Sequence, residues 1–310
     1  MRPLGDMRIL GLDIGGTKTA VVVGTEEGEI LAREEFPSEA QKGPEHMISR
    51  MLDAAGKLLA EFRADVASVS IGGPLLAEEG RILGPANLPG WDDIPLKDIL
   101  QRELGIPAYV EHDAKCGALA EWYWGAARGA ENVIFLTPGT GLGAGMILGG
   151  RLYRGAFGWA GECGHWRMAE DGPFAHGKVG SWEAFSSGVG IARLAHYMFP
   201  DRFGEGITAK EIAELAHSGD PDALAVVRRS GEVLGRGLSM LVDLLAPDVI
   251  VLGSLAHRLG ELWLGPAREV VMRESMPGHA RYCRILPAGL GERLGDCSAL
   301  CAAVYQMGLR

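Results

Sequence analysis

The most constraining feature of the sequence is a Gly-Gly turn between two runs of β-type residues near its start. The first run ends at Ile14, and the second, from Thr19 to Val23, is rich in β-branched residues. Consecutive N–H groups at such a turn can surround phosphate oxygens, and glycine lets the backbone approach a ligand closely. The P-loop and the dinucleotide-binding fingerprint both need a helix after the glycines. A strand in that place excludes both and predicts a phosphate-binding β-hairpin, with an ordinary hairpin turn as the alternative.

Composition and charge narrow the class of protein. A length of 310 residues allows two domains, and a net charge of −10 gives no overall basic surface for nucleic acid. The five cysteines lack C-x-x-C spacing, which fits a reducing compartment. The start of the chain lacks the apolar core of a signal peptide, and no run approaches the roughly 18 apolar residues of a membrane span. We therefore expect a cytoplasmic protein without nucleic-acid or membrane partners.

The second half of the sequence repeats the pattern of the first. A strand over 132–136, a Gly/Thr turn over 137–143 and a strand over 144–148 follow the order of the first hairpin. This predicts two copies of one hairpin-bearing α/β domain: 1–110, joined by a C-terminal helix at 297–310, and 111–296. Periodicity predicts the remaining elements: strands over 30–36, 66–71, 107–111 and 248–252, and helices over 47–62, 95–104, 114–126, 181–198, 208–216, 220–245 and 297–307.

Five motifs, in order along nearly the whole chain, resemble the ROK family of sugar kinases and related repressors. They are D-I-G-G-T-K at 13–18, N-L-P-G-W at 87–91, E-H-D-A at 111–114, G-T-G-L-G at 139–143 and G-E-C-G-H at 161–165. The resemblance implies an actin-like, ribonuclease-H-like two-domain sugar kinase fold with a central cleft. It implies transfer of the ATP γ-phosphoryl group to a hexose hydroxyl, expected to be the 6-hydroxyl. A homodimer is also implied.

The resemblance makes Asp113 the catalytic base that accepts the proton of the attacking sugar hydroxyl. A carboxylate that follows a strand and opens a helix pattern could instead be an N-cap. Relatives usually have Asn before this Asp, where it hydrogen-bonds the sugar. This sequence has His112, so we expect His112 to contact the sugar and to alter specificity.

The resemblance also implies further sugar ligands. Glu162, His165 and Glu183 correspond to sugar-hydroxyl ligands, and Gly73 and Asn87 to positions that line the same pocket. Carboxylates and an imidazole suit hydroxyls, because a polar group left unpaired by a wrong substrate is costly. Without the resemblance, these residues would be solvated surface or loop residues.

For ATP, the resemblance implies two glycine loops and an adenosine contact. The first loop contains Gly15, Gly16, Thr17 and Lys18. The second loop contains Gly139, Thr140 and Gly141. Gly253, which Ser254 follows, falls where relatives contact the adenosine. The alternative for Gly253 is a plain strand-to-helix turn. Mg²⁺ is expected to bridge the phosphates with few protein ligands, and Asp13 is the best candidate.

The sequence departs from the family in its metal motif. Most relatives hold a structural Zn²⁺ with one His and several Cys residues, but here the cysteine positions are Phe174, His176 and Ser181. His165 remains, with His176 and Cys163 as possible substitutes. A closed zinc site needs four N or S ligands in tetrahedral geometry. We therefore expect no structural zinc, and apolar packing of Phe174, Trp166 and Trp182 in its place.

Three alternatives compete with an ATP-dependent hexose kinase. A sugar-responsive repressor would carry a DNA-binding segment before the first glycine loop, where this sequence has only a few residues. A kinase that uses polyphosphate would need a basic groove, which Arg151, Arg154 and Lys178 suggest weakly. The presence of Asp113 argues against a non-catalytic sugar sensor. Glucose is the default substrate, followed by amino and N-acetyl hexoses.

Overall fold

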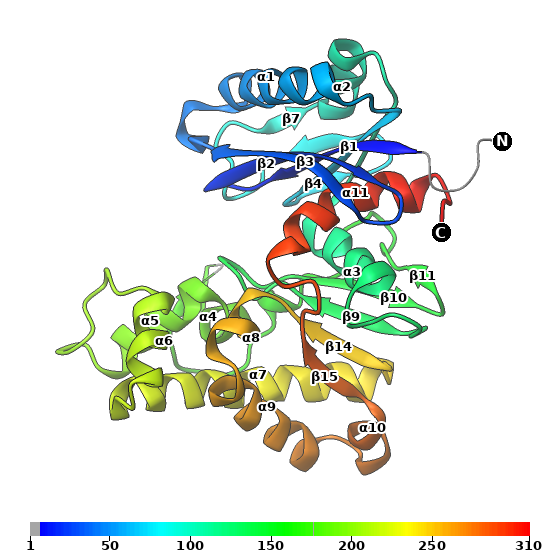
Figure 1. Ribbon diagram of the computed structural model, residues 1–310. Helices are drawn as coiled ribbons and strands as arrows, with labels where there is room; N and C mark the ends of the chain where they lie inside the picture. The colour runs from blue at the N-terminus through cyan, green and yellow to red at the C-terminus, as the bar shows by residue number, and fades with distance from the viewer. Residues whose placement is uncertain (1–6, 176) are drawn as a thin grey trace. The chain divides into compact units, whose positions relative to one another are not determined.

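The computed structural model describes residues 7–175 and 177–310, and the chain divides into two compact units (Figure 1). Unit 1 consists of the residues up to 128 together with 152–160 and 292–310, and unit 2 consists of 129–151 and 161–291. These bounds differ from those of the predicted domains. Residues 111–128 belong to unit 1 because the helix that begins at Asp113 packs against the C-terminal helix. The predicted domain assignment itself remains a prediction.

Unit 1 is built on a five-stranded sheet with the order β3-β2-β1-β4-β8. The first three strands form an antiparallel meander, while β4 pairs parallel with β1, and β8 pairs parallel with β4. All six residues of β4 are buried, as expected for a central parallel strand covered on both faces. The strands are β1 (Arg8–Ile14), β2 (Lys18–Thr25), β3 (Ile30–Pro37), β4 (Val66–Ile71) and β8 (Ala108–His112).

Helices cover both faces of this sheet. Successive residues of β1 point to opposite faces of the sheet. On one face, Leu10 and Leu12 share a core with Met47 of α1. On the other face, α11 lies so close that a side chain at Gly11 would collide with Ala299. The helices are α1 (Pro44–Glu61), α2 (Leu96–Leu104), α3 (Asp113–Trp124) and α11 (Leu294–Gln306). A small sheet that the sequence did not predict follows β4; it consists of β5 (Leu75–Leu76), β6 (Arg81–Leu83) and β7 (Asp92–Ile94).

Unit 2 repeats the strand order of unit 1, with its sheet in the order β11-β10-β9-β14-β15. Again an antiparallel hairpin, β9–β10, is followed by two strands that pair in parallel, β14 with β9 and β15 with β14. The two sheets therefore share one topology, in which an antiparallel hairpin precedes two parallel strands. The strands are β9 (Val133–Leu136), β10 (Ala144–Leu148), β11 (Arg151–Leu152), β14 (Val249–Leu252) and β15 (Arg284–Pro287).

The helix expected over 181–198 is divided in two at Ser187. This residue is extended, with ψ 171°, and its hydroxyl accepts a hydrogen bond from the Gly190 N–H, which caps a second helix. The helices of unit 2 are α4 (Trp182–Ser186), α5 (Gly188–Met198), α6 (Ala209–His217), α7 (Pro221–Leu245), α8 (Ser254–Leu259), α9 (Glu261–Glu274) and α10 (Pro277–Tyr282). Short elements complete the fold: η1 (Ala40–Lys42), η2 (Cys163–His165), β12 (Phe174–Ala175), β13 (Lys178–Val179) and η3 (Gly291–Arg293).

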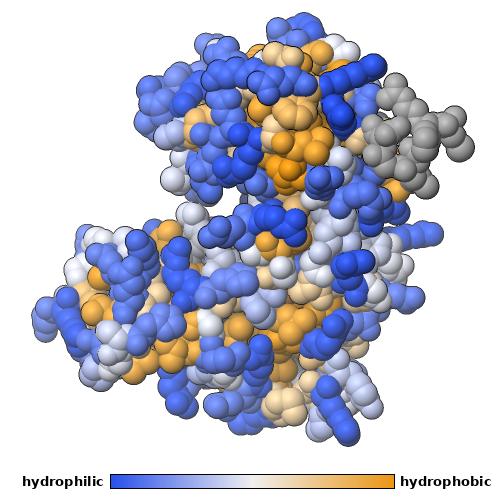
Figure 2. Space-filling model, viewed as in Figure 1, coloured by the Kyte–Doolittle hydropathy of each residue, from blue (hydrophilic) through white to orange (hydrophobic). Residues whose placement is uncertain are grey.

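Hydrophilic side chains cover much of the face shown in Figure 2, with apolar side chains in smaller groups between them. Within residues 7–175 and 177–310, no helix has both the length and the apolar character that crossing a bilayer requires.

Candidate functional site

The first glycine turn is a closed hairpin between β1 and β2. The Gly15 N–H donates to the Lys18 carbonyl at 3.2 Å. Ser38, just after β3, holds the turn from the side: its hydroxyl donates to the Gly15 carbonyl at 2.6 Å, and its N–H donates to the Thr17 carbonyl at 3.0 Å. The backbone of the predicted phosphate loop is therefore fixed before any ligand binds.

Gly16 brings two predicted site residues together. A Cβ at Gly16 would lie 2.6 Å from the Asn87 carbonyl oxygen, so a larger residue could not occupy this position without moving the backbone. The predicted sugar-pocket residue Asn87 thus packs directly on the first glycine loop.

The Lys18 side chain forms an ion pair on the surface of unit 1. Its ammonium lies 2.9 Å from the Glu35 carboxylate on β3, and its side chain is 66% exposed. Hydrogen bonds from Lys18, and then from Arg33, lower the pKa of Glu35. Because exposed ion pairs contribute little stability, Lys18 can exchange this partner for a phosphate at small cost.

Asp13 is the second-last residue of β1, two positions before Gly15. Burial, and after it the negative charge of Asp113, raises the pKa of Asp13 to about 7; Asp296 adds to the rise, whereas Ser70 and Lys18 oppose it. A Cβ at Gly295 would lie 2.7 Å from Asp13 Oδ2, so the first turn of α11 approaches the carboxylate closely. A cation at this position would favour the ionised form of Asp13.

This environment fits a magnesium ion that is held mainly by other groups. The residues that the structure describes contain no cluster of three or more His, Cys, Asp or Glu side chains able to hold a metal. Mg²⁺ commonly takes one or two carboxylates and completes its octahedron with waters and substrate phosphates. Asp13 is suited to be such a carboxylate.

Asp113 is the first residue of α3, and the cap of this helix is His112. The Nδ1 atom of His112 accepts a hydrogen bond from the Ala114 N–H at 3.2 Å, so the interpretation of Asp113 as the N-cap is wrong. The Asp113 side chain is 48% exposed, and its Oδ1 lies 2.6 Å from the Ala114 nitrogen. Its carboxylate is therefore accessible to an incoming hydroxyl group.

The ends of three parallel strands bring the predicted residues of unit 1 together. Ile14 is in register with Ile71, and Ile71 with His112, so the segments that follow β1, β4 and β8 start from one row. A Cβ at Gly73 would lie 2.7 Å from His112 Cδ2, so the imidazole packs on the backbone of Gly73. Ligands of open α/β sheets bind at this kind of edge, outside the carboxyl ends of the strands.

The second glycine turn, in unit 2, is also bonded internally. The Thr137 N–H donates to the Gly143 carbonyl at 2.9 Å, and the Gly139 N–H donates to the Gly141 carbonyl at 3.1 Å. Thr140 is exposed at the tip. The end of β14 lies beside this turn, since the Gly253 N–H donates to the Leu136 carbonyl and the Ser254 hydroxyl donates to the Pro138 carbonyl.

Glu183 and the η2 segment both pack on the second glycine turn. Glu183 Oε2 accepts a hydrogen bond from the Leu142 N–H at 2.8 Å, and a Cβ at Gly164 would lie 2.1 Å from the Leu142 carbonyl oxygen. Glu162 and His165, at the two sides of η2, are exposed. Glu183 thus fixes the second glycine turn directly, while Glu162 and His165 stand on either side of Gly164, which packs on the Leu142 backbone.

The segment that replaces the zinc motif is held by stacked indoles. Trp166 stacks on Trp182 with ring centroids 5.5 Å apart and an interplanar angle of 7°. Gly237 of α7 makes room for Trp182, since a Cβ there would lie 2.2 Å from the indole. The expectation that Phe174 joins this packing is wrong, because it is 57% exposed on β12. His176, a possible zinc ligand, lies outside the described residues.

The absence of structural zinc remains a prediction. Protein purified without added zinc should contain well under one Zn²⁺ per chain by elemental analysis, and a chelator should leave its Tm unchanged. Stoichiometric zinc whose removal lowers the Tm would contradict the prediction.

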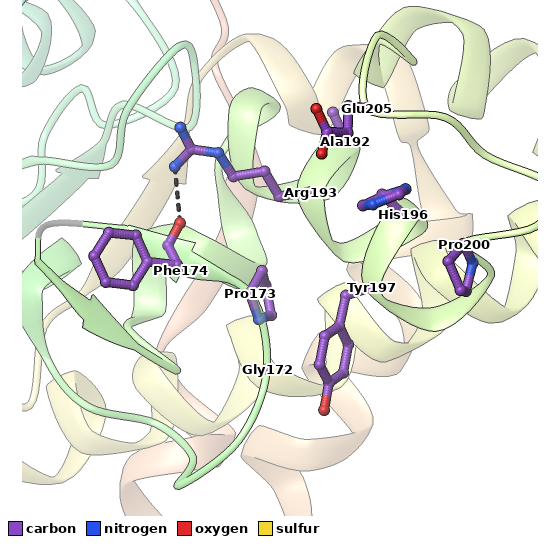
Figure 3. Close-up of a pocket in the computed structure, with 9 residues that line it drawn as sticks. All are labelled: Gly172, Pro173, Phe174, Ala192, Arg193, His196, Tyr197, Pro200 and Glu205. Carbon is purple, nitrogen blue, oxygen red and sulfur yellow. Dashed lines mark hydrogen bonds between the residues drawn. The ribbon is translucent and has the colours of Figure 1, made fainter.

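A cavity of about 650 Å³ lies in unit 2, and none of the residues predicted for the site lines it (Figure 3). The Arg193 guanidinium donates to the Phe174 carbonyl at 2.8 Å, and His196 Nδ1 donates to the Phe203 carbonyl at 2.7 Å. The lining residues are Gly172, Pro173, Phe174, Ala192, Arg193, His196, Tyr197, Pro200 and Glu205.

Sequence reasoning missed three features around Asp13 and Asp113. Ser70 and Asp296 influence Asp13, and only the position of Asp296 just before the expected last helix gave a signal. The third is a pair of charged side chains: the carboxylate of Glu111, 2% exposed, lies 2.6 Å from Arg154 Nη2. Arg154, one of the three residues considered for a polyphosphate groove, is therefore already paired.

Comparison with known proteins agrees with this geometry. The model of the ROK family matches residues 9–301. The chain belongs to the ROK family. It is 32% identical over 309 residues to a glucokinase from Halalkalibacterium halodurans, with 94% of this chain and 93% of the relative covered. It is 33% identical over 288 residues to an N-acetylmannosamine kinase from Salmonella heidelberg, with 89% and 94% covered.

A solved structure supports the fold. A ROK family glucokinase from Streptomyces griseus in complex with glucose and AMPPNP superimposes with a TM-score of 0.83 at 32% identity, covering 97% of this chain and 100% of that one. The predicted family and the actin-like, ribonuclease-H-like α/β fold are thereby confirmed.

Proposed function

We propose that this ROK protein transfers the γ-phosphoryl group of ATP to a hexose hydroxyl, expected to be the 6-hydroxyl. That the chain is a sugar kinase follows from its glucokinase relatives and from the glucokinase structure that it resembles. The observation that carries the proposal is the half-exposed Asp113 carboxylate, which opens α3 at the strand edge where Asp13 and Gly73 also lie.

In the proposed reaction, Asp113 accepts the proton of the attacking hydroxyl as the oxygen bonds to phosphorus. His112 and Gly73 border this carboxylate and are proposed to contact the sugar, together with Asn87. Glu162, His165 and Glu183 are proposed to bind other hydroxyls of the sugar.

For the nucleotide, we propose that backbone N–H groups of the two glycine turns bind phosphate oxygens, with Lys18 adding positive charge and Gly253 contacting the adenosine. A bound magnesium ion would neutralise part of the phosphate charge, and Asp13 is the carboxylate proposed to hold this ion. A position in the cytoplasm and a homodimeric state are proposed from the sequence alone.

ATP is favoured over polyphosphate as the donor because Arg154 is committed to Glu111. A coupled assay of ADP release tests the proposal over glucose, mannose, glucosamine and the N-acetyl hexoses. Turnover of at least one sugar with ATP supports it. Turnover with polyphosphate alone would favour the second donor, and binding without turnover would indicate a sugar sensor.

His112→Asn should shift the preference among sugars toward glucose. Asn offers a short amide with a donor and an acceptor, whereas the longer imidazole uses Nδ1 on the Ala114 N–H and rests against Gly73. Asn is also a good N-cap, so the Tm should change little. The measurement is kcat/KM across the panel, with His217→Asn on α6 as the control. Ratios unchanged within about twofold would place His112 outside the sugar site.

A further inference from the structure

A short segment of unit 1, residues 152–160, presents exposed aromatic rings and is firmly anchored. The exposed fractions are 74% for Phe157 and 49% for Trp159. Their ring centroids lie 6.1 Å apart at an interplanar angle of 46°, so they form an aromatic pair. Large apolar side chains that are exposed together commonly mark a binding surface.

Four contacts fix this segment to the body of unit 1. The Trp159 indole N–H donates to the Leu75 carbonyl at 3.1 Å, and the buried Lys115 donates to the Gly158 carbonyl at 3.0 Å. The other two contacts are the ion pair between Arg154 and Glu111 and the bond from the Leu152 N–H to the Tyr305 hydroxyl. The rings are therefore exposed on a fixed backbone rather than on a loose loop.

Two of these anchors come from the stretches of chain that contain the proposed catalytic base and its neighbour Gly73. Leu75 is two residues beyond Gly73, which packs on His112, and Lys115 is two residues beyond Asp113 in the first turn of α3. The segment is thus bonded both to the stretch that follows β4 and to the first turn of α3, which begins at Asp113. Because of these bonds, the acceptor sugar of the proposed reaction is the ligand that we consider for the aromatic pair.

The chemistry of a sugar supports this occupant. A pyranose carries hydroxyls around its edge and C–H bonds on its faces. The proposed sugar ligands are carboxylates, imidazoles, an amide and a glycine backbone, which suit the hydroxyls and leave the C–H faces without a partner. The face of an aromatic ring is the side-chain surface that matches such an apolar face.

We propose that Trp159 and Phe157 form an aromatic platform that binds the C–H face of the acceptor sugar. This rests on the proposed function, because the platform is part of the acceptor site. It makes Trp159 and Phe157 determinants of sugar affinity, not of the phosphoryl transfer step.

Kinetics of Trp159→Ala and Phe157→Ala test the proposal with the best sugar among glucose, mannose, glucosamine and N-acetylmannosamine. Sugar KM should rise about tenfold for Trp159→Ala and about threefold for Phe157→Ala, since aromatic contacts of this kind are worth up to an order of magnitude. The kcat and the KM for ATP should stay within about twofold. Trp159→Phe, which keeps a ring but loses the N–H, should retain most of the affinity.

Tyr153→Ala is the matched control, because Tyr153 is a 48% exposed aromatic residue of the same segment. It should leave sugar KM unchanged. If Trp159→Ala loses stability, Phe157→Ala still tests the proposal, since a side chain that is 74% exposed contributes little to folding. Unchanged sugar KM in both alanine variants would overturn the proposal, and a changed oligomeric mass with unchanged KM would assign the rings to a contact between copies of the chain.

Calorimetric titration with the same four sugars, without nucleotide, separates this inference from the proposed function. Sugar binding that weakens in Trp159→Ala supports the platform even if no sugar is phosphorylated. Phosphorylation with a Kd that is the same in parent and variants would leave the kinase proposal standing and overturn the platform. Binding of none of the four sugars to the parent protein would overturn both.

Discussion

Asp113→Asn should lower kcat by about 10² to 10⁴, the usual contribution of general acid–base catalysis, while sugar binding is largely kept. The variant preserves the size of the side chain and removes the group proposed to accept the proton. The structure also indicates that it will fold, because the cap of α3 is supplied by His112 and not by Asp113. The loss should therefore fall on kcat, with little change in Tm.

Asp98→Asn is a suitable control for this variant. Asp98 also lies in the first turn of a unit 1 helix, α2, and its side chain is exposed. Its replacement should leave kcat, KM and Tm close to those of the parent. A kcat for Asp113→Asn within a few-fold of the parent would remove Asp113 from the role of base.

Most of the fold could be predicted from the sequence because its strands are strongly patterned. β4 was predicted with its observed bounds, since its run of β-branched and small residues ends at the turn residues Gly72, Gly73 and Pro74. The small sheet of β5, β6 and β7 was missed because strands of two or three residues carry no readable period. The division at Ser187 was missed because a serine hydroxyl that caps a helix looks like an ordinary polar residue until the chain is folded.

The candidate site was only partly predictable for a similar reason. Motifs identified Asp13, Asp113 and the glycine turns, but no local signal connects Gly16 with Asn87 or Glu183 with the Leu142 N–H. These contacts depend on backbone segments that meet only in three dimensions. The role of His112 as a cap was hidden too, because histidine is not among the usual N-cap residues.

Asp13→Asn should stabilise the metal-free protein at pH 8 and abolish most of its activity. The Asp13 carboxylate lies close to the first turn of α11, and burial, followed by the negative charges of Asp113 and Asp296, raises its pKa to about 7. In an unfolded chain an aspartate has a pKa of about 4. Between these values the folded state holds a proton that the unfolded state has released, so the free energy of unfolding falls as the pH rises from about 4 to about 7.

Asparagine removes this dependence because it is neutral at every pH. The full pKa difference corresponds to about 4 kcal/mol. Asp13 is not fully buried, which reduces the effect, so we expect a gain of roughly 2 kcal/mol at pH 8 that disappears as the pH falls to about 4. Activity is lost because the carboxylate proposed to hold Mg²⁺ is absent. Asp13 would then be a residue that lowers the stability of the protein but is required for its function.

Thermal melts of both proteins in EDTA from pH 4 to pH 8 measure the effect, with Asp53→Asn on the exposed face of α1 as the control. MgATP should then raise the Tm of the parent at pH 8 more than that of Asp13→Asn, since only the parent keeps the ligand. Equal melting temperatures of the parent and Asp13→Asn at pH 8 would show that the ionised Asp13 carboxylate does not destabilise the folded protein. Equal stabilisation by MgATP would show that it does not hold the metal.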